Sequence, residues 1–142
     1  MREWLRAHAI TLAFVVSLVA TGGSLFLSEV LGYIPCDLCW YQRIFMYPLV
    51  LLLGRAAIRG DRRIVGYALP PSIIGGLISA YHYALQKVPG LAKVSPCKAG
   101  IPCNTDYLDF FGVITIPLMA LVAFILITAC LLLIRRGAEV DA

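Results

Sequence analysis

Charged residues are scarce in this sequence. Asp, Glu, Lys and Arg together make up 14% of its 142 residues, whereas hydrophobic residues make up 61%. Because about one-quarter of the residues of an ordinary soluble domain are charged, this chain has too few polar residues to cover a water-facing surface. The low charge therefore excludes an ordinary soluble domain and predicts an integral membrane protein.

The sequence also lacks the regular alternation of apolar and polar residues that membrane barrel strands need. Its apolar residues instead form four blocks that approach or reach the roughly 20 residues with which a helix crosses a bilayer. We therefore predict an all-α chain, folded as a membrane four-helix bundle in a single domain over residues 1–142. The expected spans are about 9–30, 39–58, 64–85 and 110–134, and the expected outer loops are 31–38 and 86–109.

Positive charge is distributed unevenly between the two sides of these spans. Eight of the twelve Lys and Arg residues fall on one side: Arg2, Arg6, Arg55, Arg59, Arg62, Arg63, Arg135 and Arg136. Cytoplasmic loops of membrane proteins carry an excess of Lys and Arg. The pattern predicts a multi-pass protein of the cell (plasma) membrane, with both termini and the 55–63 loop in the cytoplasm.

Only five cysteines are present, and four of them fall on the predicted outer side: Cys36, Cys39, Cys97 and Cys103. Three interpretations of these four compete, namely two structural disulfides, a Cys₄ zinc site, and a relay of exchangeable disulfides. Zinc is disfavoured because the stretch CKAGIPC places five residues between its cysteines, where zinc knuckles usually have two to four. We therefore expect no metal site. Cys130, within the last span, is interpreted as a small apolar filler.

The residues around Cys36 and Cys39 favour exchangeable disulfides over structural ones. Pro35 precedes Cys36, and a helix is expected to begin around Cys36 to Cys39. The positive end of a helix macrodipole stabilises thiolate, which is the species that attacks disulfides. Two intervening residues also make a small ring, whereas structural bridges more often close longer loops.

Two polar side chains interrupt the predicted spans near the same boundary. Arg43 follows Cys39 by four residues, so it lies on the same helix face about one turn deeper. A charge inside a span costs about 2.5–3.5 kcal/mol and marks a candidate functional site; the alternative is an arginine that reaches the outer headgroups. His82 is either an interfacial histidine between Tyr81 and Tyr83, or a donor or proton carrier at a site shared with Arg43.

Several stretches together resemble the disulfide bond formation protein B family (DsbB, called BdbC in some Gram-positive bacteria). The stretch PCDLCWYQR is similar to the second-helix motif of that family, and YHYALQ and DYLDFFGVITIP agree with it. The resemblance extends over essentially the whole chain. The short spacing between Cys97 and Cys103 resembles the Gram-positive type. The order of the pairs differs from that of the vitamin K epoxide reductase family, in which the loop pair precedes the Cys-x-x-Cys.

The resemblance implies a quinone-dependent membrane oxidase that re-oxidises an extracytoplasmic thioredoxin-fold dithiol oxidase of the DsbA/BdbD type. Cys36 and Cys39 would exchange electrons with a membrane quinone, either menaquinone or ubiquinone, with Cys39 at the quinone ring. Arg43 would polarise a quinone carbonyl, and His82 would lie near the quinone head. Cys97 and Cys103 would form the second pair, of which Cys97 would meet the partner's thiol.

A quinone is also the expected acceptor because the sequence contains no Gly-rich phosphate loop and no soluble nucleotide-binding domain. The expected partners are the dithiol oxidase and the lipid bilayer, with no nucleic acid. Two other functions remain alternatives to the enzyme. One is a non-enzymatic membrane protein with two structural disulfides, which predicts no dependence on Arg43. The other is a thiol metal-binding protein, which predicts bound zinc.

Overall fold

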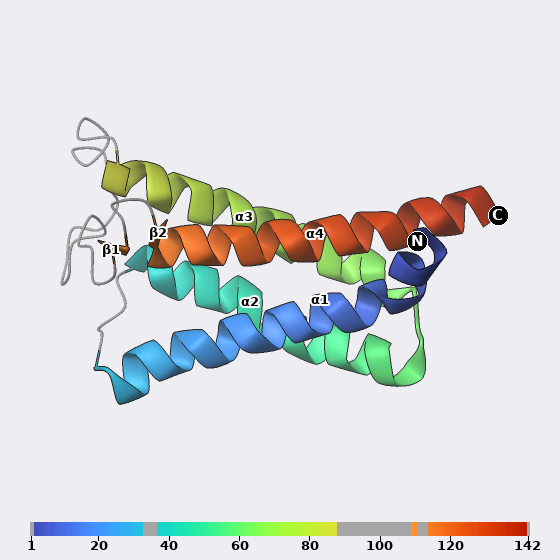
Figure 1. The fold of residues 1–142 in the computed structure, drawn as a ribbon, viewed down its shortest axis with the longest axis horizontal. Coiled ribbons are helices and arrows are strands. Elements are labelled where there is room, and N and C mark those ends of the chain that lie inside the picture. Colours follow the sequence, from blue (N-terminus) through green and yellow to red (C-terminus); the bar gives the residue numbers. More distant parts are fainter. Residues whose placement is uncertain (1, 33–36, 88–108, 111–113, 142) are drawn as a thin grey trace.

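The computed structural model describes residues 2–32, 37–87, 109–110 and 114–141. Four long α-helices account for most of them: α1 (Arg2–Leu25), α2 (Asp37–Arg59), α3 (Ile64–Lys87) and α4 (Ile116–Asp141). A π-helical turn, η1 (Phe26–Val30), continues α1 without a break. Figure 1 shows the long helices running side by side. The predicted helical class is therefore confirmed for the described part of the chain.

Each long helix packs against two others. Helix α1 contacts α2 and α4, and α3 likewise contacts α2 and α4. The beginning of α1 and the end of α4 lie at the same end of the structure as the turn between α2 and α3 (Figure 1). This arrangement agrees with the expectation that both termini and the 55–63 loop share one side, while the side of the membrane stays a prediction.

The turn between α2 and α3 has a local sequence signature. Gly60 directly follows the last residue of α2 and has a φ of 66°. Glycine populates this left-handed region without steric cost, and it commonly ends helices there. One residue later, the Asp61 carboxylate accepts a hydrogen bond from the backbone N–H of Arg63 at 3.0 Å. The short connection keeps α2 and α3 antiparallel and adjacent.

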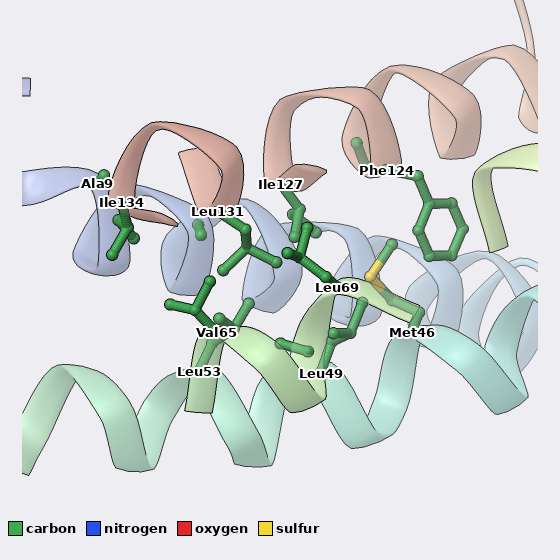
Figure 2. Packing of buried hydrophobic residues seen from close by; sticks show 13 residues of the cluster. Ala9, Met46, Leu49, Leu53, Val65, Leu69, Phe124, Ile127, Leu131 and Ile134 are labelled. Atoms are coloured by element: carbon green, nitrogen blue, oxygen red, sulfur yellow. The ribbon is translucent and has the colours of Figure 1, made fainter. Parts of the chain in front are cut away.

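A single apolar cluster joins all four helices (Figure 2). Its buried members are Ala9, Ala13, Met46, Leu49, Leu53, Val65, Ala68, Leu69, Ala123, Phe124, Ile127, Leu131 and Ile134. Alanines from α1, α3 and α4 and larger side chains from α2, α3 and α4 fill the space together. Side chains that interlock in this way hold the helices at a fixed distance and register. Cys130 packs at the edge of the cluster, in agreement with the role of an apolar filler.

The ring of Phe124 in α4 packs directly against Gly75 of α3. A Cβ atom added to Gly75 would lie 2.4 Å from Cε1 and Cζ of Phe124, so only glycine fits against this ring. The hydroxyl of Ser72 donates to the Phe124 carbonyl at 3.4 Å and hydrogen-bonds the Thr128 hydroxyl at 2.6 Å. Small residues and hydroxyl groups of this kind stabilise helix pairs where the surroundings are apolar.

The last helix begins later than the sequence pattern predicts. We expected a span from about residue 110, but α4 begins at Ile116. Before it, β1 (Asp109–Phe110) pairs antiparallel with β2 (Ile114–Thr115), in the register Asp109 to Thr115 and Phe110 to Ile114. Aromatic and β-branched residues favour strands, and Pro117 is tolerated only in the first turn of a helix. These two short strands are the exception to the predicted all-α class.

Three of the described helical segments are long and apolar enough to cross a membrane, namely Ala7–Val30, Ile64–Leu85 and Leu118–Gly137. They correspond to the first, third and fourth predicted spans. The predicted second span, 39–58, is a helix, but it is not among the three. Its longest uncharged stretch is short, running from 44 to 54 between Arg43 and Arg55. Whether α2 crosses the membrane stays a prediction.

Candidate active site

Cys39 lies in the first turn of α2, where the sequence predicts an activated thiol. The helix begins at Asp37, and Cys39 is half-buried. It packs, together with Ile78 of α3, against the buried pair Leu38 and Leu85. In this position the thiol meets the positive end of the α2 macrodipole, which stabilises a thiolate. This cluster also joins the first turn of α2 to α3.

Arg43 lies one turn further along α2, as the spacing predicts, and its guanidinium group is held in place by α1. Its Nε donates to the Ser24 hydroxyl at 2.9 Å, and its Nη2 donates to the Ser24 carbonyl at 3.1 Å. The guanidinium carbon lies 5.2 Å from the centroid of the Trp40 ring, within the range of a cation–π interaction. These three contacts orient a permanent positive charge one turn after Cys39 on α2.

The partner of Arg43 belongs to a distorted part of the first helix. Ser24 lies just before η1, whose widened turn is marked by the hydrogen bond from the Leu31 N–H to the Phe26 carbonyl at 3.2 Å. Single π-helical turns of this kind occur frequently at functional sites. No sequence signal marks this turn or Ser24, because the contact depends on how α1 and α2 are aligned. Ser24 is therefore a site residue that sequence reasoning missed.

His82 is linked to α2 through Gln42. The Gln42 side chain donates from Nε2 to Nδ1 of His82 at 2.8 Å. Both residues are buried, with 6% of Gln42 and 1% of His82 exposed. The hydrogen bond fixes the orientation of the imidazole ring and ties α3 to α2 one turn below Cys39.

From the sequence, Gln42 is a source of a hydrogen-bonding amide, but it is not among the predicted site residues. The sequence contains a signal that Gln42 is buried. Leu38, four residues before Gln42, and Leu49, seven residues after it, lie on the same buried face of α2. A polar residue on such a face needs a hydrogen-bonding partner inside the protein. The sequence could therefore indicate that Gln42 has a partner, although it could not identify that partner as His82.

The predicted site shared by Arg43 and His82 stays a prediction, because different helices hold the two side chains. Arg43 points to α1 and is held by Ser24, whereas His82 of α3 is held by Gln42, the neighbour of Arg43 in the chain. Arg43 is therefore held by a residue of α1, and His82 is held by a residue of α2. The other three predicted catalytic residues, Cys36, Cys97 and Cys103, lie outside the described residues.

The Gln42–His82 hydrogen bond gives a testable prediction about stability. We expect Gln42→Leu alone to lower the free energy of unfolding by about 1–3 kcal/mol, because it leaves a buried imidazole nitrogen without this partner. Replacing both residues, as Gln42→Leu with His82→Phe, should cost less than the sum of the two single changes. Thermal unfolding of the purified variants in detergent measures this double-mutant cycle. If the loss of unfolding free energy in the double variant equalled the sum of the two single losses, Gln42 and His82 would not be coupled.

Comparison with known proteins shows the family of this chain. Residues 6–134 match the sequence profile of the family described as disulfide bond formation protein DsbB. The chain belongs to the DsbB family. It is 54% identical over 123 residues to disulfide bond formation protein C of Bacillus subtilis, with 87% of this chain and 89% of the relative covered. A probable disulfide formation protein of Oceanobacillus iheyensis is 50% identical over 133 residues, with 91% and 90% covered.

The similarity to DsbB family members extends beyond Bacillus and its close relatives. A probable disulfide formation protein of Coxiella burnetii is 42% identical over 130 residues, with 91% of this chain and 88% of the relative covered. No solved structure matches the chain. Family membership and the three apolar helices together indicate a multi-pass membrane protein.

Proposed function

We propose that this chain is a membrane thiol–disulfide oxidoreductase that re-oxidises an extracytoplasmic thioredoxin-fold dithiol oxidase and passes the electrons to a membrane quinone. The disulfide-forming part of the proposal is supported by the names of its relatives, which are disulfide formation proteins. The thioredoxin-fold partner is supported by the sequence motifs, and the quinone is supported by the sequence motifs and by the fixed Arg43 side chain.

The observation that carries the proposal is a cation that is fixed one helical turn after the helix-terminal thiol. Arg43 follows Cys39 by one helical turn, and the two hydrogen bonds to Ser24 hold its side chain against α1. An arginine that merely reached for headgroup phosphates would have no need of a partner inside the protein. Here the guanidinium group is half-buried between two helices. Such a pre-oriented charge suits the recognition of a ligand that becomes negative during reaction.

The described residues fit a quinone head group at this position. Ser24 uses two of the guanidinium donors, and an arginine carries about five N–H donors in all. The remaining donors would bind a quinone carbonyl, with Cys39 at the ring and His82 behind Gln42. When bound, a quinone supplies an acceptor for two electrons and two protons. Arg43 cannot lose its proton, so its contribution is to bind and to stabilise negative charge.

The protein's own thiols carry the electrons between the partner and the membrane. A thiolate of the reduced partner would attack the disulfide between Cys97 and Cys103, and the partner's second thiol would then close the partner's disulfide. Exchange with the disulfide between Cys36 and Cys39 restores the loop pair and leaves Cys36 and Cys39 as thiols. In total two thiols become one disulfide, and two electrons and two protons leave through Cys36 and Cys39.

The proposed orientation places both termini in the cytoplasm and the reactive cysteines outside. The beginning of α1, the end of α4 and the α2–α3 turn lie at one end of the structure, and eight of the twelve Lys and Arg residues belong to these segments. This supports the orientation, because cytoplasmic segments of membrane proteins carry an excess of Lys and Arg. Disulfides form and persist in oxidising compartments outside the cytoplasm. In this orientation Cys39 lies where extracytoplasmic thiols and a lipid-dissolved quinone can both reach it.

Variants of Arg43 test the proposal. We expect Arg43→Met to raise the KM for a short-chain quinone by about tenfold to a hundredfold, since a charge-assisted hydrogen bond contributes about 1.5–3 kcal/mol. Arg43→Lys should fall between wild type and Arg43→Met, because it keeps the charge and loses the fork of donors. Quinone absorbance, followed with a reduced thioredoxin-fold substrate, gives the rate.

Arg55→Met is the matched control for this experiment. It removes the same charge from the same helix, three turns away from Arg43, and should leave the quinone KM unchanged. If Arg43→Met had the KM and kcat of the wild type, Arg43 would serve only to anchor α2 to α1, and the proposed quinone contact would be wrong.

A further inference from the structure

A concave site lies between α1 and α2, at the opposite end of α2 from Cys39. It is an open groove of about 460 Å³. Apolar side chains line most of it: Phe14 from α1, and Val50, Leu51 and Ile58 from α2. Leu51 and Ile58 are largely uncovered by protein, with 77% and 87% of their surfaces exposed. The groove therefore presents a hydrophobic surface that needs an apolar neighbour.

Gly54 gives the groove its shape. A Cβ atom at this position would lie 3.0 Å from Cε2 of Phe14, so the aromatic ring lies directly against the α2 backbone. With no side chain at position 54, α1 and α2 come together at the base of the groove. Val50 and Leu51 then form its wall on one side of Gly54, and Ile58 on the other.

Two arginines of α2 also line the groove. Arg55 and Arg59 are four residues apart, so they lie on one face of α2, and both line the groove. Both are exposed. Among the described residues neither has an ion pair or a side-chain hydrogen bond. Arg59 is the last residue of α2, so this charge lies at the end of an apolar surface.

We infer that this groove binds one molecule of an anionic phospholipid. An acyl chain would lie along Phe14, Leu51 and Ile58, and the phosphate of the headgroup would bind Arg55 and Arg59. Guanidinium groups match phosphate oxygens in geometry and in charge, and basic pockets between helices at the membrane surface are typical sites for anionic lipids. The inference goes beyond the redox function and rests only on the placement of α1 and α2 in the membrane.

Lipid binding to the purified full-length protein tests this inference. In native mass spectrometry from detergent, we expect the wild type to retain phosphatidylglycerol about tenfold more strongly than phosphatidylcholine with the same acyl chains. The double variant Arg55→Gln/Arg59→Gln should bind the two lipids within about twofold of each other. Soluble glycerol phosphate should not displace the lipid at equal concentration, because it lacks the acyl chain.

The double variant Arg62→Gln/Arg63→Gln is the matched control. It removes the same charge from the adjacent turn, and neither residue lines the groove. It should keep the preference of the wild type for phosphatidylglycerol. Equal losses in the two double variants would mean that net charge alone selects the lipid and would overturn the site. A wild type without preference, or equal competition by glycerol phosphate, would overturn it as well.

Discussion

Cys39→Ser is expected to reduce quinone turnover to the uncatalysed background, a loss of at least about a thousandfold. Serine has nearly the same size as cysteine and should keep the packing against Leu38 and Leu85. Its hydroxyl cannot form a disulfide, and only the thiolate attacks one. The measurement is the steady-state rate of quinone reduction with a reduced thioredoxin-fold substrate. The fold should be unaffected, as judged by the unfolding temperature in detergent.

Cys130→Ala is the matched control for Cys39→Ser. Cys130 is also a half-buried helical thiol, but it belongs to α4 and packs at the edge of the apolar cluster. Its removal should leave the turnover number within about twofold of the wild type, since a filler side chain contributes only packing. If Cys39→Ser kept more than a tenth of the activity, or if Cys130→Ala lost most of it, the assignment of the reactive thiol would be wrong.

Gly75→Val is expected to destabilise the packing of α3 against α4. Even the Cβ atom of the new side chain would lie 2.4 Å from the Phe124 ring. The ring is 1% exposed and cannot turn outward without breaking the contact between α3 and α4. Overpacking of this kind costs about 1–3 kcal/mol and occasionally more. We expect a clear fall in the unfolding temperature and a lower yield of folded protein.

Two further variants separate this steric effect from the general effect of replacing glycine. Gly66 lies in the same helix, and a Cβ atom added there would have nothing within 4 Å. Gly66→Val should therefore change the unfolding temperature little. Combining Gly75→Val with Phe124→Ala should recover part of the loss, because it removes the ring that the valine would meet. If the Gly75→Val protein were as stable as the Gly66→Val protein, the close packing of the Phe124 ring against Gly75 would be contradicted.

The helices themselves could be predicted from the sequence, because long apolar blocks in lipid can satisfy their backbone hydrogen bonds only within each helix. The start of α4 was predicted less well. The apolar run extends back to Phe110, and apolarity alone does not distinguish a helix from the short pairing of β1 with β2. The strand propensity of Ile114 and Thr115 and the position of Pro117 contain that information, but they are weak local signals.

The site was predictable only within α2. The separation of Cys39 and Arg43 by one turn follows from helix geometry, and the structure has them on one helix in that spacing. The contacts of Arg43 with Ser24, 19 residues away, and of Gln42 with His82, 40 residues away, could not be derived. They depend on the rotation and alignment of whole helices. That alignment is set by contacts such as Gly75 with Phe124 and Gly54 with Phe14, which a single sequence does not reveal.

The central claim is that electrons from thiols leave through Cys39 to a membrane quinone. The most direct test is an anaerobic reaction of the purified protein with a reduced thioredoxin-fold substrate and a short-chain quinone, in which free thiols and quinone are counted together. One quinone should be reduced for every two thiols lost, because each disulfide releases two electrons. Thiol loss without quinone reduction, or quinone reduction that persists in Cys39→Ser, would contradict the claim.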